Sequence, residues 1–552
     1  MTDGLDADVL IAGGGPCGLM LANELGKRGV RTLLLTDKPS TTTFPQANAT
    51  QARTMEHYRR LGFAAKVRAL GLPPDYPTDV TYWTRFSKYE LARFALPASG
   101  RAQDLVKRLG GSWSAAELPH RCSQLYIERV LRDEAEKHPT VRLRFGWRVI
   151  GFVDHGDRVE VAAEPAAGGA PQRFVGRYLV AADGPRSPVR KTLGIAYSGE
   201  SGAVREYMGG PQHAMHFRSP DLLRRIAGAK AWQYISVNRD RRGVLLPLDG
   251  EQSFVFHAQL KADEGGHNFT DAEARALFFA ALGAECQMDL IERRSWTAGY
   301  TLVAERFGAG RVLLGGDAVH LFTPTGGLGY NTAVEDAVNL GWKLAALVQG
   351  WGGDGLAASY EAERKPVALR NTAYARGFAD SVGLYKIPDD FEDATPSGAA
   401  ARQEAGRHLH AHARAEFDIP GVTFGVRYDG SPLVVSDGHA PPSDAANVYV
   451  PSAVPGGRAP HLWLDDGRSL YDVFGFEFTL LRLGRCAPDA TAFAAAAQAR
   501  GVPLTVVEFT EDRARDLYET DLALIRPDQI VAWRGNRLPG DPAALLAKVT
   551  GH

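Results

Sequence analysis

The sequence lacks several features that would place it in particular protein classes. None of its apolar runs reaches the roughly 20 residues that a membrane-spanning helix needs. The formal net charge is only -1, so no excess of positive charge indicates nucleic acid or an anionic membrane as a partner. The acidic first eight residues contain neither the basic region nor the cleavage site of a signal peptide. We therefore expect a cytoplasmic protein with no nucleic-acid or membrane partner.

Cysteine is also scarce. The chain has four, Cys17, Cys122, Cys286 and Cys486, and none stands in a CxxC or in metal-ligand spacing. This scatter argues against a disulfide framework and a redox role, and it agrees with a reducing compartment. We expect no metal site.

The sequence does contain a complete nucleotide-binding pattern at its start. An apolar strand over residues 8–12 precedes a G-x-G-x-x-G motif, an amphipathic helix and a second strand that ends at Asp37. In such a unit Gly13 permits the tight turn, Gly15 admits a pyrophosphate to the helix N-terminus, and Gly18 allows close helix packing. Asp37 accepts hydrogen bonds from a ribose.

A second strand end of the same kind follows later. The apolar residues 177–182 lead into Asp183 and Gly184, which places an aspartate beside a glycine turn at the end of a buried strand. Two such strand ends in one chain support each other.

The richest stretch is residues 315–344, GGDAVHLFTPTGGLGYNTAVEDAVNLGWKL. A strand over residues 311–314 delivers Asp317, and a loop with Gly326, Gly327 and Gly329 opens a helix predicted to begin near Asn331 or Thr332. Glycines permit positive φ and close approach to a flat ring, and the helix start offers free N–H groups. On its own, this stretch would fit a glycine-rich surface turn as well as it fits a ligand-binding loop. The two other motifs favour a bound ligand.

The rest of the chain divides by composition. Between residues 203 and 300, alternating runs over 232–237, 243–248 and 253–260 predict an inserted, antiparallel sheet that forms one wall of a pocket. Residues 388–451 are rich in Pro, Gly and Ala and predict a partly structured linker. The last hundred residues alternate strands and helices in a compact α/β pattern.

With these motifs in order, the chain resembles the single-component FAD-dependent aromatic hydroxylases. It is most similar to the phenol hydroxylase-like branch, whose C-terminal domain is thioredoxin-like, here without the CxxC. The resemblance implies an α/β fold in five parts: a Rossmann-like FAD-binding domain over 1–200 and 301–386, a substrate-binding sheet domain over 201–300, a linker over 387–452, and the thioredoxin-like domain over 453–552. We expect a homodimer.

The resemblance also implies the cofactors and their contacts. FAD would lie extended, with NADPH or NADH as electron donor, and Asp183 and Gly184 would serve both. Arg53 and Asp317 would approach the pyrophosphate, and the isoalloxazine would lie against Pro324 to Asn331. The expected FAD contacts are Gly13, Gly15, Pro16, Gly18, Asp37, Lys38, Gln46, Arg53, Gln124, Asp183, Gly184, Asp317, Pro324, Gly327, Gly329, Tyr330 and Asn331.

The substrate side departs from the family pattern. Where the branch places an Asp near the phenol hydroxyl, this chain has Asn48, and a neutral amide cannot take a proton. His257 is the candidate substitute, since a neutral imidazole accepts a proton near neutral pH. Asn48, His257 and Pro324 are thus the catalytic candidates. The other substrate candidates, chosen only because they lie in the inserted sheet, are His213, His216, Trp232 and Tyr234.

The implied reaction is hydroxylation of a phenolic ring by O2 and NAD(P)H through a flavin C4a-hydroperoxide. Epoxidation, Baeyer–Villiger oxidation and hydroxylation with loss of nitrite or halide on the same scaffold stay open. The halogenase segment WxWxIP is absent from the sequence. A flavin-binding sensor without turnover is the remote alternative.

Overall fold

The computed structural model describes residues 4–203, 205 and 207–552. A six-stranded sheet in the order β17-β18-β9-β1-β2-β5 forms its centre, and all neighbours are parallel except β17 and β18. Its strands are β1 (Val9–Ala12), β2 (Thr32–Thr36), β5 (Val141–Phe145), β9 (Tyr178–Ala181), β17 (Gly308–Ala309) and β18 (Val312–Leu314). The strands β1, β2, β9 and β18 are buried at every position, because a parallel sheet is covered on both faces.

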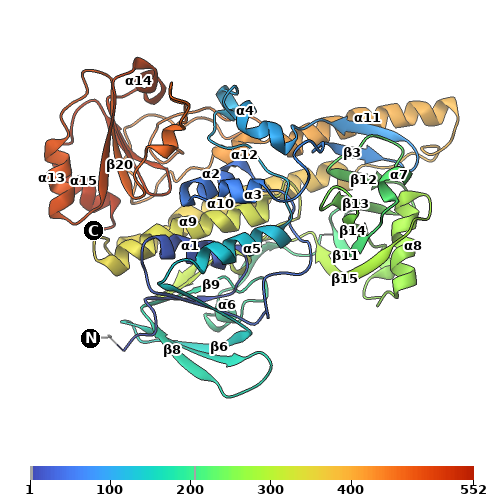
Figure 1. The fold of residues 1–552 in the computed structure, drawn as a ribbon, viewed down its shortest axis with the longest axis horizontal. Coiled ribbons are helices and arrows are strands. Elements are labelled where there is room, and N and C mark those ends of the chain that lie inside the picture. The colour runs from blue at the N-terminus through green and yellow to red at the C-terminus, as the bar shows by residue number, and fades with distance from the viewer. Residues whose placement is uncertain (1–3, 204, 206) are drawn as a thin grey trace.

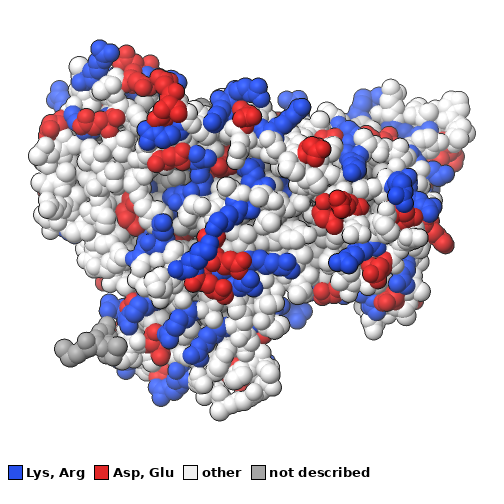
Figure 2. All heavy atoms as spheres, viewed as in Figure 1, with Lys and Arg blue, Asp and Glu red and all other residues white. Residues whose placement is uncertain are grey.

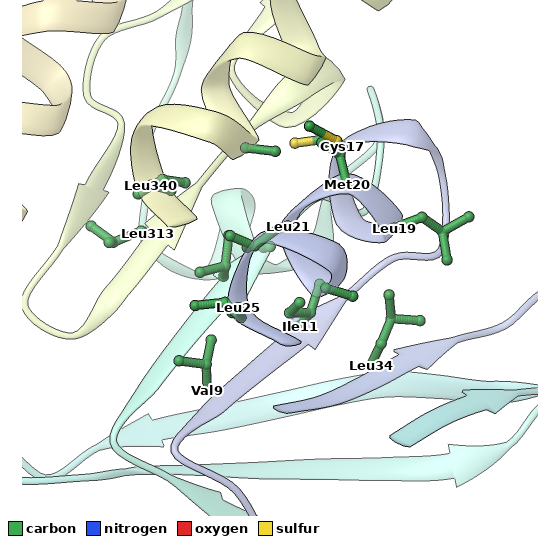
Figure 3. Packing of buried hydrophobic residues seen from close by; sticks show 14 of the residues in the cluster. Val9, Ile11, Cys17, Leu19, Met20, Leu21, Leu25, Leu34, Leu313 and Leu340 are labelled. Carbon is green, nitrogen blue, oxygen red and sulfur yellow. The ribbon is translucent and has the colours of Figure 1, made fainter. Parts of the chain in front are cut away.

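Helices cover one face of this sheet and smaller sheets complete the domain. Helix α1 (Pro16–Lys27) packs against α9 (Leu328–Gln349) and α5 (Gln124–Ala135). Figure 3 shows Leu21 and Leu25 of α1 between the strand residue Val9 and the α9 residue Leu340. The smaller sheets are β6 (Trp147–Asp154), β7 (Val159–Pro165) and β8 (Gln172–Gly176), and β10 (Tyr197–Glu200), β16 (Thr301–Ala304) and β19 (His320–Leu321).

A seven-stranded sheet forms the second domain, at the right of Figure 1. Its order is β15 (Asp289–Ala298), β11 (Gly210–Arg218), β14 (Ser253–Gln259), β13 (Arg242–Pro247), β12 (Gln233–Val237), β3 (Val80–Trp83) and β4 (Glu90–Phe94). All pairs are antiparallel except β12 with β3. Two strands therefore come from a part of the chain that the sequence assigned to the first domain. Helix α8 (Asp271–Leu282) covers the outer face.

The segment predicted as a partly structured linker contains two helices, one of them long. Helix α11 (Pro396–Phe417) packs on β3, β4 and α10 (Gly355–Gly383), and α12 (Pro420–Phe424) follows it. The buried positions of α11 include Gly398, Ala405, Gly406 and Ala413. Such a face of small residues packs closely against a sheet, yet by composition it looks like a linker.

The C-terminal domain has the expected thioredoxin-like arrangement. Its sheet order is β21 (Leu504–Phe509), β20 (Phe478–Leu483), β22 (Leu522–Ile525) and β23 (Val531–Gly535), and α13 (Thr491–Ala499) connects the parallel pair β20 and β21. The remaining helices of four or more residues are α2 (Ala52–Leu61), α3 (Ala64–Arg68), α4 (Ala102–Val106), α6 (Pro188–Thr192), α7 (Leu222–Arg225), α14 (Asp512–Tyr518) and α15 (Pro542–Val549). The limits predicted at residues 200, 300, 386 and 452 stay predictions.

Two surface properties complete the description. Within the described ranges, no helix combines the length and the apolar composition that crossing a bilayer requires. On the face seen in Figure 2, acidic and basic side chains are interspersed among uncharged ones.

The C-terminal domain docks through a core and through buried ion pairs. Trp342 and Leu356 of α9 and α10 share a hydrophobic cluster with Phe478 and Phe493. Beside it, the Glu363 carboxylate accepts hydrogen bonds from Arg526 at 2.6 and 2.9 Å. Burying charge is costly unless it is paired, so these contacts fix the orientation of the docked domain.

A second buried cluster joins α2 to the same domain. Glu56 is bound by Arg458 at 2.5 Å and by Arg53 at 2.9 Å, and its side chain is fully buried. Burial alone would raise the pKa of the Glu56 carboxyl, but the two guanidinium groups lower it to about 2. Glu56 thus contributes stability that is present above pH 4.5 and is lost as the pH falls through 2.

We predict that Glu56→Gln lowers stability at pH 7 by about 3 kcal/mol, because it leaves two buried cations without their counter-charge. The deficit should shrink as the pH falls from 4.5 towards 2, where the wild-type carboxyl also becomes neutral. Apparent thermal unfolding midpoints at pH 7, 4 and 3 measure this. The exposed Glu136→Gln is the matched control. A deficit that is the same at all three values would contradict the prediction.

Candidate active site

The three sequence motifs meet at the carboxyl edge of the six-stranded sheet. The strands β1, β9 and β18 lie side by side and lead into Gly13, Asp183 and Gly315 respectively. Gly13 has φ 109°, and a Cβ there would lie 2.1 Å from the Ala182 carbonyl oxygen. A Cβ on Gly316 would approach Cys17 of α1 to 3.1 Å. Only glycine allows the first of these contacts.

The N-terminus of α1 is open to a ligand. Gly15 is the N-cap, and nothing lies within 4 Å of the position of a Cβ on it. Pro16 occupies the first helical position, where a missing N–H removes no helix hydrogen bond. A Cβ on Gly18 would lie 2.0 Å from the Gly13 carbonyl oxygen, so this glycine lets helix and turn pack closely. The free N–H groups and the helix dipole favour a phosphate here.

Charged side chains follow the two strands that flank β1. Asp37 and Lys38 follow β2 and are exposed. Asp183 follows β9, and neither of its carboxylate oxygens has a hydrogen-bond partner among the described residues. Burial raises the pKa of the Asp183 carboxyl. A buried acceptor without a partner is expensive, so Asp183 is available to a ligand hydroxyl or N–H group.

Asp317 is tied to the Asp183 segment by a short chain of contacts. The Tyr197 hydroxyl donates to the Asp317 carbonyl oxygen at 2.5 Å, and Arg190 lies 3.8 Å above the Tyr197 ring. The Asp317 side chain itself is exposed, but the dense protein around it still raises the pKa of its carboxyl through desolvation.

The glycine loop leads into α9, which begins at Leu328 rather than near residue 331. Gly326 and Gly327 have φ values of 62° and 66°, and Gly327 is the N-cap. Gly329 is already helical, and a Cβ on it would make only ordinary contact with Phe322 at 3.4 Å. Of the three glycines, only Gly326 and Gly327 adopt the positive φ that glycine permits, because the helix starts before Gly329. Pro324 is exposed beside the loop.

Side chains from two other segments hold this loop. The Gly326 carbonyl accepts from Gln51 Nε2 at 2.8 Å, and the Gly326 N–H donates to Glu416 Oε1 at 2.8 Å. The other oxygen of Glu416 is bound by His412 Nε2 at 2.8 Å, and both side chains are almost fully buried. The loop is thus fixed by α11, the helix that the sequence assigned to a linker.

The first turns of α9 are held in the same way. Asn331 Oδ1 accepts from the Gln51 N–H at 2.8 Å and from Thr54 Oγ1 at 2.7 Å, and Asn331 Nδ2 donates to the Ala49 carbonyl at 3.0 Å. The Tyr330 hydroxyl bonds the Tyr58 hydroxyl. The side chains of Asn331 and Tyr330 therefore contact protein. The groups available to a cofactor here are the backbone N–H groups at the start of the helix.

Gln46 and Gln124, two of the expected cofactor contacts, lie close together. Gln124 Nε2 lies 3.5 Å from Gln46 Oε1 and donates to Glu128 Oε1 at 2.6 Å. Gln124 Oε1 accepts from the Ala47 N–H at 3.4 Å. The structure thus adds Glu128 to this pair.

The structure contradicts the expected phosphate contact of Arg53. Its guanidinium donates to Glu56, to Gln529 Oε1 at 2.6 Å and to the Asp528 carbonyl at 2.7 Å, and it is buried. It therefore faces the C-terminal domain. The physical reason is that a buried acid and two acceptors of the docked domain satisfy its donors.

The sheet sorts the substrate candidates by face. His257, His216 and Trp232 lie on the inner face, towards α10 and α11. His213 packs on Phe269 at 4.7 Å and Tyr234 belongs to the cluster under α8, so these two face away. Successive residues of a strand point to opposite faces, and membership of the sheet alone cannot select the face. The expectation for His213 and Tyr234 is wrong.

His257 and Asn48 are the two remaining candidates on the substrate side. The His257 ring meets the Trp296 ring edge-on at 5.9 Å, and neither His257 Nδ1 nor Trp296 Nε1 has a partner among the described residues. Burial lowers the pKa of His257 to about 4, so its imidazole is neutral at pH 7. Asn48 donates to the Gln46 carbonyl at 3.0 Å and is 9% exposed, which leaves its amide oxygen free.

Comparison with known proteins identifies this arrangement. The FAD binding domain family matches residues 6–375, and the C-terminal domain of aromatic-ring hydroxylases matches residues 452–552. The chain belongs to the FAD-dependent aromatic-ring hydroxylases. It is therefore a flavoprotein monooxygenase that binds FAD and uses NAD(P)H as electron donor.

Individual relatives agree over the whole chain. Aklavinone 12-hydroxylase RdmE of Streptomyces purpurascens is 30% identical and covers 99% of this chain and 98% of its own length. The FAD-dependent monooxygenase apdD of Emericella nidulans is 30% identical over 98% of this chain and 90% of its own. A structure of RebC with bound 7-carboxy-K252c has 33% identity and a TM-score of 0.88, with 99% of both chains covered.

The site fits FAD on observations of this chain alone. The open helix start at Gly15, the unpartnered Asp183 carboxylate and the free N–H groups at the start of α9 lie along one sheet edge. An extended dinucleotide carries phosphates, ribose hydroxyls and an electron-poor ring that match these groups in kind.

Several residues of the hydroxylase that hold the site were missed from the sequence. Asp336, within the glycine-loop helix, accepts from the Gly316 N–H at 3.1 Å, from His320 at 2.7 Å and from Arg364 at 2.8 Å. The sequence shows Asp336 in the segment DAVNL, but its three partners lie 16 to 28 residues away and could not be assigned from it. Glu416 and His412 stand four apart on α11, which is a recognisable helix pair.

We predict that Glu416→Leu weakens FAD binding by roughly tenfold, because it leaves the Gly326 N–H without an acceptor and frees the loop. The substitution keeps a similar volume and removes the carboxylate that the Gly326 N–H and His412 share. Equilibrium dialysis of FAD against the apoenzyme measures the change. The exposed Glu404→Leu on the same helix is the control and should bind FAD as the wild type does. Equal affinities in all three proteins would refute the role of Glu416.

Proposed function

We propose that the enzyme hydroxylates a phenolic, fused-ring aromatic substrate at an electron-rich carbon. The observation that supports this most is the neutral His257 beside Trp296, on the sheet face that packs with the segment holding Asn48. The hydroxylase relatives named above include an aklavinone hydroxylase, which supports a multi-ring substrate. Bound FAD supplies the activation of O2 once NAD(P)H has reduced it.

The proposed cofactor contacts follow the geometry. Gly13, Gly15, Pro16 and Gly18 would receive the pyrophosphate and Asp37 the ribose, with Lys38 beside them. Asp317, Gln46 and Gln124 would contact the middle of the cofactor, and Asp183 and Gly184 the region shared with the nicotinamide donor. Pro324 and the N–H groups from Gly327 to Asn331 would face the flavin ring, where they stabilise negative charge on its N1/C2=O edge.

On the substrate side, the residues position rather than deprotonate. Because the pKa of His257 is about 4, its neutral imidazole is a weak base but a good acceptor for a substrate hydroxyl. Asn48 can accept a second hydrogen bond through its amide oxygen, and it cannot take the proton. Trp296 and Trp232 provide flat apolar walls.

A screen of phenols, naphthols and hydroxyanthraquinones tests the function. The holoenzyme is mixed anaerobically with NADPH or NADH, and the rate of flavin reduction is measured with and without each compound. A hydroxylase should show faster reduction with at least one compound, followed in air by a hydroxylated product and one O2 per NAD(P)H. Epoxide, ester or halide-free products would instead indicate the same-scaffold alternatives. If no compound accelerates reduction or is converted, the proposal fails.

We predict that His257→Ala retains FAD but lowers kcat/KM for hydroxylation roughly tenfold, the value of one lost hydrogen bond. Asp317→Ala should instead release FAD more readily. FAD content and product formation of both variants measure this. Full activity in both would refute the assignment.

A pH prediction follows from the same histidine. The wild-type kcat/KM should show no inflection from His257 between pH 5.5 and 8, because its imidazole becomes protonated only as the pH falls through about 4. An inflection near pH 6.5 that disappears in His257→Gln would contradict this environment.

Two further properties complete the proposal. The family resemblance supports a homodimer, and the need for NAD(P)H supports a cytoplasmic location. Light scattering of the purified holoenzyme and cell fractionation measure them.

A further inference from the structure

Arg121 is a largely buried arginine without a counter-charge. It precedes α5 and its residue is 9% exposed, yet no described residue accepts a hydrogen bond from it or forms an ion pair with it. Arg121 does make a cation–π contact: its guanidinium carbon lies 4.3 Å from the centre of the Trp232 ring. Buried arginines are normally paired, so a cation left with only an aromatic ring is unusual.

The backbone around Arg121 belongs to the flavin side of the site. His120 and Thr50 exchange two backbone hydrogen bonds, of 2.8 and 2.9 Å, and the Gln124 N–H donates to the Ala47 carbonyl at 2.7 Å. Arg121 therefore lies beside the segment of residues 47–50. The same segment accepts a hydrogen bond from Asn331 of α9 at the Ala49 carbonyl.

Trp232 connects Arg121 to the opposite wall. Its ring meets Phe417 of α11 edge-on at 6.0 Å, and the neighbouring Glu416 is the residue that holds the Gly326 N–H. Trp232 also belongs to the cluster on the inner face of the seven-stranded sheet. Arg121 thus lies close to segments that contact the glycine loop before α9, helix α11 and the inner face of the seven-stranded sheet.

We propose that Arg121 binds an anionic oxygen of the substrate, so that the preferred substrates are aromatic acids that carry a ring carboxylate. This inference rests on the proposed function and adds the substrate class to it. A guanidinium presents paired N–H donors that match a carboxylate, and the contact with the Trp232 ring holds it in place without using those donors. Burial lowers the pKa of Arg121 to about 10, so it remains charged at neutral pH.

Binding of matched acid and ester probes tests this. The FAD-loaded enzyme is titrated with salicylic acid, 3-hydroxy-2-naphthoic acid and anthraquinone-2-carboxylic acid, each against its methyl ester, and Kd is taken from the change in flavin absorbance. The wild type should bind at least one acid about tenfold or more tighter than its ester. Arg121→Met should remove that preference and leave ester affinity unchanged, and Arg121→Lys should keep part of it.

Arg129→Met is the matched control, since it removes an equal charge from the exposed side of α5 and should keep the preference. If no pair shows an acid preference in the wild type, or if Arg121→Met keeps it, the inference is overturned. Should Arg121→Met not yield holoenzyme, the wild-type pairs and Arg121→Lys still decide the outcome.

The rate of flavin reduction separates this inference from the proposed function. If the esters accelerate flavin reduction and are hydroxylated as efficiently as the acids, the proposed hydroxylase function stands and the proposed anion site is refuted. If the acids bind in an Arg121-dependent way but no aromatic compound accelerates flavin reduction, the anion site is supported and the proposed hydroxylase function is refuted.

Discussion

A carboxylate with no exposed surface, Asp336, holds the cofactor side of this enzyme together. It binds the Gly316 N–H, His320 and Arg364, so one side chain of α9 fixes the turn that carries Asp317. Burial would raise the pKa of the Asp336 carboxyl, but His320 and Arg364 lower it. Because an unpaired buried charge is so costly, this arrangement has few alternatives. The chain that enters the glycine loop before α9 is therefore held in a fixed position.

The same helix joins all parts of the molecule. Its first turns are bonded to residues 49–54 through Asn331. Further along, Trp342 donates to Asp528 of the C-terminal domain, and Lys343 donates to Glu363 of α10, which in turn binds Arg526 of that domain. The loop in front of it is held from the other side by Glu416 of α11, which also contacts the substrate sheet. Cofactor and substrate walls thus share their supports. A change at either wall alters the loop between them.

Much of the cofactor side could be predicted because it depends on backbone conformation. Gly13 and Gly18 are needed where a Cβ would collide with the neighbouring chain, and that requirement is visible in one short motif. The substrate side could not be predicted in this way. His213 and His216 face opposite sides of one strand, but the sequence did not show which side packs towards α10 and α11. Arg53 donates to an acceptor 475 residues away. Helix α11 was missed because its buried face consists largely of small residues.

The sequence by itself determined the nucleotide-binding unit, the order of the motifs and the enzyme family, since each follows from local spacing along the chain. Only the tertiary structure decided which sheet face lines the pocket, which acid holds the flavin loop, and which cation lacks a partner. These depend on pairings between distant segments, such as Gly326 with Glu416 and Arg121 with Trp232. The energy of a buried polar group depends on its partners, and the chain meets those partners only when it folds.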